Sequence, residues 1–436
     1  MLQTLRDAFK IKDLRRRIGY TFFMLIIVRL GSLLPVPGVN GSAFSSLFAN
    51  SDGALNFFDS ITGGSFSEMS VFALNITPYI TSSIIMQLLT IAFPKLEEMQ
   101  RDGETGRKKM TQITRYLTVG LALGESIAMA IAFGRSGYLV KFNALYVIMV
   151  VAALTAGSAV LMWIGERITE RGIGNGISIV LTINIVSRIP VDLANLKQQF
   201  MSGKTIPKAT LSGVVIAAII IALVVMVVIL QSAERRIPVQ YSNKIQGKRQ
   251  VGGASSVIPM KVNTAGVIPV IFAQSILQTP VMICSLLKVN GTGFWGKVLA
   301  GMAQNNWFNP NNGWYTIGAV VYILLIIGFA YFYTEITFNP LEIAENLKRS
   351  GGFIPGIRPG KPTSDYLTSI LRHIIFIGAV GLSIVAIMPI IFNGLFGASV
   401  SFGGTSIIII VGVIVETLKQ VESQMMVRNY KGFLND

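Results

Sequence analysis

The feature that most constrains the fold of this chain is the clustering of its apolar residues into stretches of about 20 residues, the length that a helix needs to cross a bilayer. Hydrophobic residues make up 52% of the chain and charged residues only 13%, with a mean hydropathy of +0.60. A composition this apolar is unlike that of an ordinary soluble domain. The sequence therefore predicts an all-α polytopic membrane protein.

Ten such stretches follow one another along the chain. The predicted spans are Gly19–Val36, Ala73–Phe93, Ile113–Phe133, Leu145–Ile164, Ile177–Leu196, Leu211–Gln231, Ala265–Leu287, Trp314–Ile336, Ile370–Ile391 and Thr405–Val421. Because this number is even, both termini are predicted to lie on the same side of the membrane.

The basic residues identify that side. Of the 37 Lys and Arg residues, 28 lie in the terminal tails, in alternate loops or at the span ends that adjoin them, eight lie toward the opposite side, with Arg188 of the fifth span among them, and Arg29 lies inside the first span. Cytoplasmic loops carry the excess of Lys and Arg in membrane proteins. Both termini are therefore predicted to be cytoplasmic. The net charge of +16 suits anionic lipid headgroups, ribosomal RNA or an acidic protein surface.

Some predicted spans are too polar to face lipid on all sides. The second contains the polar run Asn75–Ser83, and the fifth carries Asn184, Ser187 and Arg188, whereas Val214–Leu230 is almost purely aliphatic. Polar groups at membrane depth face a wet cavity or hydrogen-bond to neighbouring helices. Both interpretations remain open for each span.

A short apolar segment before the second span is unusual. The run Phe57–Phe66 combines aromatic residues with a pair of glycines and is too short to cross the membrane. Short pieces of this kind at membrane depth persist where they line a cavity or pack inside protein. One interpretation is a re-entrant, movable stopper, and the other is a half-buried external loop.

Two predicted cytoplasmic loops, Ser232–Thr264 and Thr337–Ser369, are longer than passive connectors usually are. The first alternates polar and apolar residues, which predicts a short hairpin. In the second, repeated Gly and Pro around Arg358 predict a stiff tip that presents a guanidinium. We interpret both loops as docking sites for a cytosolic partner. If the basic residues served topology alone, the glycines and prolines would have no role.

Catalytic and metal-binding motifs are absent from the sequence. His373 is the single histidine and Cys284 the single cysteine, so neither a His cluster nor a disulfide is possible within the chain. The glycine-rich run Gly172–Gly176 lacks the spacing of a phosphate-binding loop. We therefore expect neither an enzyme nor a bound cofactor or metal.

Five stretches occur in order along essentially the whole chain, namely Arg29–Ser32 with Pro35–Gly38, Ala73–Ile80, Gly165–Gly176, Ala265–Pro269 and Gly352–Gly360. Together they resemble the SecY family, the central subunits of the bacterial protein-conducting channel. The resemblance implies a channel that passes unfolded secretory polypeptides across the bacterial plasma membrane and releases signal sequences and transmembrane segments sideways into lipid.

In that family, two five-helix halves of inverted topology surround an hourglass pore. The resemblance implies an N-terminal half of residues 19–196, with a plug at about 55–68, and a C-terminal half of residues 211–421. The cytoplasmic loops would be residues 232–264 and 337–369, and the cytoplasmic tails residues 1–18 and 422–436.

The site residues implied by the resemblance form four groups. The pore ring would consist of Ile76, Ile80, Ile177, Leu181, Ile271 and Ile409, where Leu181 replaces an expected isoleucine of similar volume. The plug would include Phe57, Phe58, Ile61, Gly63, Gly64 and Phe66. The lateral gate would carry Thr81, Glu125, Asn263 and Ser275, and the motor or ribosome contact Arg235, Arg236 and Arg358. For Glu125, a carboxylate satisfied inside its own helix bundle is the alternative.

The implied partners are SecE and SecG subunits, the SecA motor ATPase, the ribosome, secretory and membrane-protein nascent chains, and anionic membrane lipids. A secondary transporter of a small solute is the alternative function, because ten spans in inverted halves with broken helices would suit one equally well. The scarcity of paired charges within the spans and the two large docking loops favour the channel.

Overall fold

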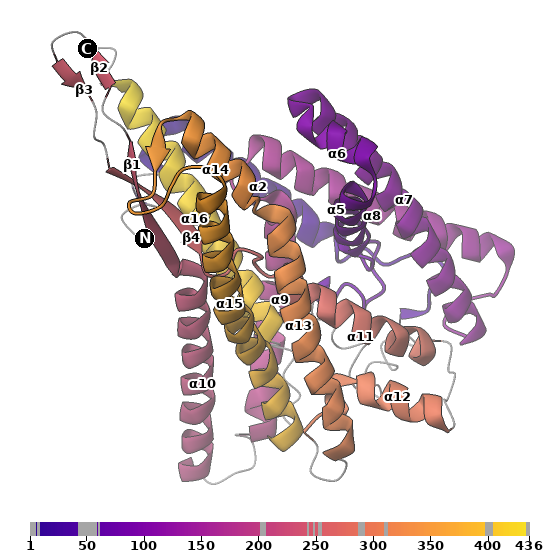
Figure 1. The fold of residues 1–436 in the computed structure, drawn as a ribbon. Coiled ribbons are helices and arrows are strands. Elements are labelled where there is room, and N and C mark those ends of the chain that lie inside the picture. Colours follow the sequence, from indigo (N-terminus) through magenta and orange to yellow (C-terminus); the bar gives the residue numbers. More distant parts are fainter. Residues whose placement is uncertain are drawn as a thin grey trace. The chain divides into compact units, whose positions relative to one another are not determined.

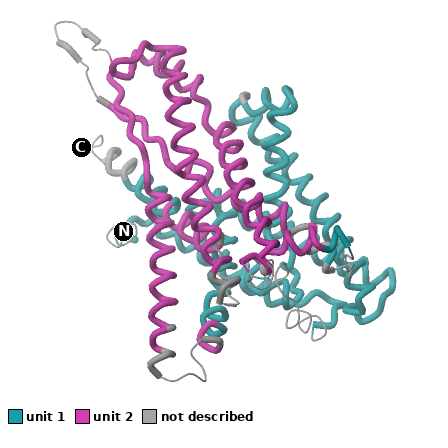
Figure 2. Tube along the Cα trace, turned by 60° about the horizontal axis from the view of Figure 1, so that its bottom comes forward, with its two compact units in different colours: residues 1–195, 281–296, 416–436 teal, residues 196–280, 297–415 magenta. Residues whose placement is uncertain are grey.

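The computed structural model describes residues 6, 9–41, 59, 62–200, 206–241, 244–246, 249–251, 255–286, 293–308, 313–396 and 404–432, and this part of the chain is mostly helical (Figure 1). The chain divides into two compact units (Figure 2). Unit 1 comprises residues 1–195, 281–296 and 416–436, and unit 2 comprises residues 196–280 and 297–415. Each unit has its own apolar clusters.

A helix is found at each of the ten predicted spans. These helices are α2 (Lys12–Gly31), α5 (Thr77–Ala92), α7 (Gly103–Arg135), α8 (Ala144–Arg171), α9 (Gly176–Phe200), α10 (Ile206–Ser232), α11 (Ile268–Leu286), α13 (Ile317–Thr337), α15 (Lys361–Phe396) and α16 (Gly404–Gly432). Among the described residues, six are long and apolar enough to cross a membrane, namely α7, α8, α9, α10, α13 and α15. A bent pair, α5 with α6 (Pro94–Arg101), adds a seventh if it counts as one span.

The core of unit 1 is built around α8, which packs against α2 and α7. Apolar residues of α5, α8 and α9 form one cluster with α2. After α2 the chain forms turns with isolated β-bridges, and the Val36 N–H donates to the carbonyl of Met69 at 2.8 Å. A β-carbon on Gly157 of α8 would lie only 1.9 Å from the carbonyl oxygen of Val71. Helix α8 therefore approaches the backbone before α5 as closely as a glycine permits.

The core of unit 2 gathers aliphatic residues from α10, α11, α13, α15 and the first part of α16 around one tryptophan. Trp307 is fully buried between η1 (Gln304–Asn306) and η2 (Gly313–Thr316), close to α12 (Phe294–Met302). Its indole N–H donates to the carbonyl of Gly301 at 2.7 Å, and its ring centroid lies 5.6 Å from that of Tyr322. The indole N–H is thus satisfied inside an apolar core.

Unit 2 also contains a small sheet formed by the two long loops. Its strand order is β4 (Ser255–Lys261), β1 (Glu234–Tyr241), β5 (Gly352–Phe353), and all pairs are antiparallel. A second pair, β2 (Lys244–Gln246) with β3 (Arg249–Val251), extends the same loop. The predicted hairpin is therefore confirmed. Ile237 and Val239 of β1 are buried in one cluster with Leu347 of α14 (Pro340–Arg349) and with Leu367 of α15.

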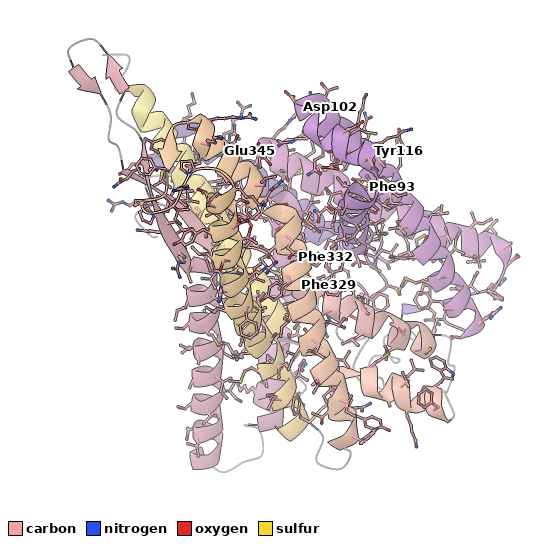
Figure 3. All side chains as sticks on the ribbon, in the orientation of Figure 1. Phe93, Asp102, Tyr116, Phe329, Phe332 and Glu345 are labelled. Atoms are coloured by element: carbon pink, nitrogen blue, oxygen red, sulfur yellow. The ribbon has the colours of Figure 1, made fainter. Side chains whose placement is uncertain are left out.

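Large apolar side chains are exposed on the helices of both units (Figure 3). Phe93 and Tyr116 of unit 1 are 55% and 79% exposed, and Phe332 of unit 2 is 41% exposed. Exposed apolar residues in these numbers suit helices whose outer surfaces contact lipid.

Candidate functional site

The predicted plug segment lies in unit 1, against α9. Of its six predicted residues, Gly63, Gly64 and Phe66 are described, and Phe66 is buried in the cluster of α7 and α8 residues. Phe57, Phe58 and Ile61 lie outside the described residues. Asp59 and residues 62–76 are described, and the contacts below are those of these residues with α9.

A buried ion pair joins this segment to α9. The carboxylate of Asp59 is fully buried and pairs with the guanidinium of Arg188, whose side chain is 22% exposed. The other carboxylate oxygen accepts the Ser67 N–H at 2.8 Å. Arg188 Nε also lies 3.9 Å from an oxygen of Asp192, one turn further along α9. A carboxylate is tolerated in such an environment only with partners of this kind.

Gly63 packs closely against α9. Gly63 has a φ of +68°, and a β-carbon built there would lie 2.4 Å from the carbonyl oxygen of Asn184. The hydroxyl of Ser187 donates to that same carbonyl at 2.7 Å and lies 3.4 Å from the carbonyl oxygen of Gly63. Both the left-handed backbone and the lack of space require glycine at this position.

A buried polar network continues from this contact to the start of α5. Asn75 adopts a φ of +52° just before the helix, and its side-chain oxygen accepts a hydrogen bond from the Asn184 amide at 3.0 Å. The hydroxyl of Ser158 donates to the Asn75 carbonyl at 3.2 Å. All three residues are buried. Here polar residues of the second and fifth predicted spans hydrogen-bond to each other. This is the second of the two interpretations of polar spans, in which their polar groups bond to neighbouring helices.

The predicted pore-ring residues occur in both units. In unit 1, Ile76 is fully buried, Ile80 and Ile177 are partly buried in the same apolar cluster, and Leu181 is buried on α9. In unit 2, the corresponding predicted residues are Ile271, partly buried on α11, and Ile409, buried on α16. Ile76 and Ile80 lie one turn apart, and the Ile80 N–H donates to the Ile76 carbonyl at 3.0 Å.

The predicted gate residues are likewise divided between the units. In unit 1, Thr81 donates to the Thr77 carbonyl of its own helix at 3.0 Å, and Glu125 is half-buried on α7. In unit 2, Asn263 is buried, and its amide nitrogen has no hydrogen-bond partner among the described residues. Ser275 is exposed on α11.

The three predicted docking arginines lie on strand β1 or on the turn that follows β5 of the same sheet. Arg235 and Arg236 lie on β1, and Arg358 is exposed on the turn that follows β5. Arg236 is 70% exposed and pairs with Glu234 at 2.8 Å. Gly356 and Gly360 flank Arg358 with φ values of +83° and +104°, which form the tight turns expected there. The two loops that sequence analysis treats separately are therefore joined through β1 and β5.

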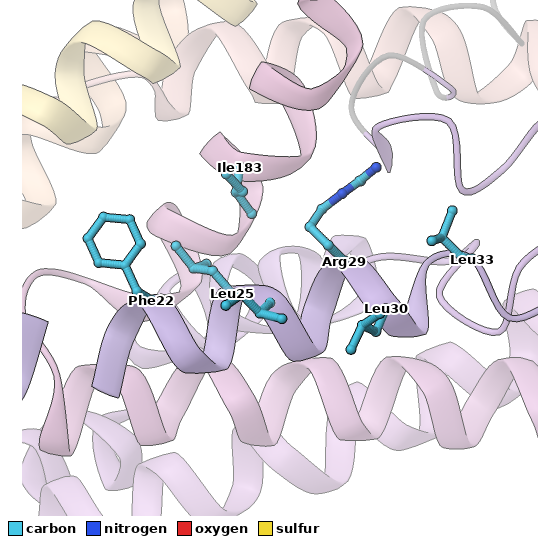
Figure 4. Close-up of a pocket in the computed structure, with 7 residues that line it drawn as sticks. Phe22, Leu25, Arg29, Leu30, Leu33 and Ile183 are labelled. Atoms are coloured by element: carbon cyan, nitrogen blue, oxygen red, sulfur yellow. The ribbon is translucent and has the colours of Figure 1, made fainter. Parts of the chain in front are cut away.

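A pocket of about 280 Å³ opens between α2 and α9 in unit 1 (Figure 4). Its lining is apolar except for one residue and consists of Phe22, Leu25, Ile26, Arg29, Leu30, Leu33 and Ile183. One guanidinium nitrogen of Arg29 is buried and has no hydrogen-bond partner within the described part of the chain.

Sequence analysis missed the pairing of Asp59 with Arg188. A signal for it was available, because each residue is an isolated charge in a segment predicted to lie at membrane depth. Charges in such positions require partners of opposite sign. Sequence pattern alone does not say which of the possible partners is in contact.

Similarity to known proteins agrees with these observations. A SecY family model matches residues 70–418. The chain is 41% identical to the protein translocase subunit SecY of Streptomyces galbus and 40% identical to that of Bacillus subtilis strain 168, each over 100% of both chains. A solved structure described as that of a protein conducting channel is similar, with a TM-score of 0.64 and 18% identity over 94% of this chain and 92% of that one.

Two further structures share the fold. One is described by its plug domain, which stabilises the closed state of the SecY channel, and has a TM-score of 0.65 with 19% identity over 94% of this chain and 92% of that one. The other, Sec61 in the canine ribosome-channel complex, has a TM-score of 0.61 with 18% identity over the same shares. The predicted all-α polytopic fold is thereby confirmed. On the match to most of its length and its identity to full-length relatives, the chain belongs to the SecY family of plasma-membrane protein translocase subunits, which are channel components and not enzymes.

Proposed function

We propose that this chain forms the channel through which unfolded secretory polypeptides cross the plasma membrane, and from which signal sequences and transmembrane segments leave sideways into lipid. The observation that carries this proposal is identity of about 40% to translocase subunits over the whole chain. The close packing of Gly63 against α9 supports it, because a plug must dock inside the protein to close the pore. Nothing in the described residues specifically favours a solute transporter.

The pore and plug have distinct tasks in this proposal. The ring of Ile76, Ile80, Ile177, Leu181, Ile271 and Ile409 surrounds the extended polypeptide loosely and forms no hydrogen bonds with it. In the empty channel, a constriction of branched apolar side chains resists hydration and closes by dewetting. The plug is the segment of about residues 55–68, of which Asp59 and residues 62–68 are described, and it seals the pore against ions.

The orientation follows from the charge pattern, and the partners follow from membership of the SecY family. Both termini are cytoplasmic, and residues 19–196 and 211–421 form the two inverted halves. The basic tip that carries Arg235, Arg236 and Arg358 docks the SecA motor and the ribosome. SecE and SecG accompany the chain, and anionic lipids contact its basic face. In support, solved neighbours of the same fold include channels bound to ribosomes.

The lateral gate is assigned to Thr81, Glu125, Asn263 and Ser275. A carboxylate and polar side chains at membrane depth stabilise a closed gate if they bond across it. Replacement Glu125→Leu is expected to lower the signal strength needed for export. Unchanged export of precursors with weak signals in this variant would contradict the assignment of these residues to the gate.

Site-specific crosslinking tests the proposal. A cysteine is introduced by Ile80→Cys in a Cys284→Ser background, and a secretory chain with a thiol-reactive probe is stalled during export. We expect a crosslink that depends on the signal sequence and on SecA or the ribosome. No crosslink, together with uptake of a small solute by vesicles that contain the protein, would favour the transporter instead.

A further inference from the structure

One guanidinium on α9 lies between two carboxylates that belong to different parts of unit 1. Arg188 pairs with Asp59 of the plug segment, and its Nε lies 3.9 Å from an oxygen of Asp192. The side chains of Asp59 and Asp192 are 0% and 5% exposed, and that of Arg188 is 22% exposed. Asp192 is fixed on the same helix as Arg188, whereas Asp59 belongs to the segment that must leave when the channel opens.

We propose that Arg188 is a latch for the plug that releases Asp59 but keeps Asp192 on opening, and that this loss of one partner sets the strength of signal sequence needed to open the channel. The inference rests on the proposed function, because it takes the segment around Asp59 to be the plug. Arg188 acts here as a positioning residue.

The closed state benefits from Asp59 in two ways. Its carboxylate neutralises Arg188, and its second oxygen accepts the Ser67 N–H at 2.8 Å within the segment. Ser67 belongs to the same segment, so this bond can travel with the plug, whereas the bond to Arg188 must break. A buried cation that loses its only partner is strongly disfavoured. With Asp192 still beside it, Arg188 keeps a counter-charge in the open state.

The two carboxylates therefore act in opposite directions. Asp59 stabilises only the closed state, so Asp59→Asn is expected to ease opening. Asp192 matters most when Asp59 has left, so Asp192→Asn is expected to make opening harder. A general loss of stability would change the ease of channel opening in the same direction for both variants. The opposite signs are thus specific to the latch.

The test uses the full chain in complex with SecE and SecG, reconstituted into vesicles of phosphatidylethanolamine and phosphatidylglycerol. One readout is the passive leak of iodide without SecA, and the other is export, driven by SecA and ATP, of a secretory precursor with an intact or a weakened signal. Asp59→Asn should raise the leak and the export of the weakened precursor about tenfold. Asp192→Asn should lower export of the weakened precursor by a similar factor.

The double variant provides the decisive comparison. Without Asp59, opening no longer changes the partner of Arg188, so adding Asp192→Asn to Asp59→Asn should leave leak and export at the level of Asp59→Asn. As a matched control, Glu104→Gln neutralises a carboxylate that is 85% exposed and paired with Lys108, and it should change neither readout.

Three results would overturn the latch. They are effects of the same sign for the two single variants, additive effects in the double variant, or variants equal to the unaltered chain. In each case the unaltered chain still exports the intact precursor, and the proposed function stands. Failure of the unaltered chain to export that precursor would instead remove the proposed function.

Discussion

The two units contain ion pairs of the same chemistry in opposite environments. In unit 1, Asp59 and Arg188 pair with side chains that are 0% and 22% exposed. In unit 2, Glu234 and Arg236 pair at 2.8 Å with side chains that are 26% and 70% exposed. The first pair joins the segment before α5 to α9, and the second joins two residues of one strand.

Burial determines what each pair can do. Removing one partner of a buried pair leaves an uncompensated charge, so the pair strongly favours the one arrangement that contains both groups. An exposed pair contributes about 0–1 kcal/mol and exchanges readily with water or with another protein. The buried pair of unit 1 is suited to holding a conformation, and the exposed arginine of unit 2 is suited to meeting a partner.

The largest expected effect separates the two arginines. Arg188→Met leaves Asp59 buried without its cation and should lower the free energy of unfolding by about 3 kcal/mol. Arg236→Met, the matched control, should lower it by at most about 1 kcal/mol. Denaturant unfolding of the purified complex in detergent measures both. Equal losses for the two variants would show that burial does not distinguish the pairs.

The next effect concerns Gly63, where the proposed plug docks on α9. Gly63→Ala places a β-carbon against the Asn184 carbonyl and strains a positive φ, and it should weaken plug docking by about 2 kcal/mol or more. Gly64→Ala shares the positive φ, but its β-carbon would lie 3.6 Å from Arg188 at the nearest, so it should cost only about 1 kcal/mol. Iodide leak from vesicles reports the difference. If both variants leak alike, backbone strain alone accounts for the effect.

A smaller effect is expected at the exposed tip of unit 2. Arg358→Glu reverses an exposed charge at the proposed SecA contact, and export driven by SecA should fall about tenfold with no change in passive leak. The control Arg135→Glu reverses an exposed charge on the side predicted to be external. It should leave export unchanged. A matching loss in both variants would mean that net charge, and not this tip, governs coupling to the motor.

Sequence periodicity anticipated the elements of this fold well. The run Val214–Leu230 has no polar residue, and it is helical in α10. The alternating residues of the first long loop form β1 and β4. The first pattern is visible because the apolar run is long enough to cross a bilayer as a helix, and the second because side chains alternate along a strand. The glycines that flank Arg358 likewise predicted tight turns, and the structure contains them.

The contacts between elements were harder to predict from the sequence. Asp59 and Arg188 are 129 positions apart, and no local pattern states that they meet. The pairing of β1 with β5 joins two loops that the sequence separates by α11 and α13. In each case the contact depends on how distant elements pack, and composition limits only which partners are chemically possible.

The smallest expected effect tests whether the exposed pair competes with a partner. Glu234 holds Arg236 through two bonds, from Nε at 2.9 Å and from Nη2 at 2.8 Å. Glu234→Gln removes this charge and should raise the affinity for SecA about twofold, since Arg236 no longer exchanges partners on binding. Binding titrations at low and high salt measure the change. Because exposed charges are screened within about 3 Å at 1 M salt, the gain should disappear there. A gain that persists at high salt would mean that Glu234 acts through the shape of β1, and Arg236 would then resemble Arg188 in fixing structure.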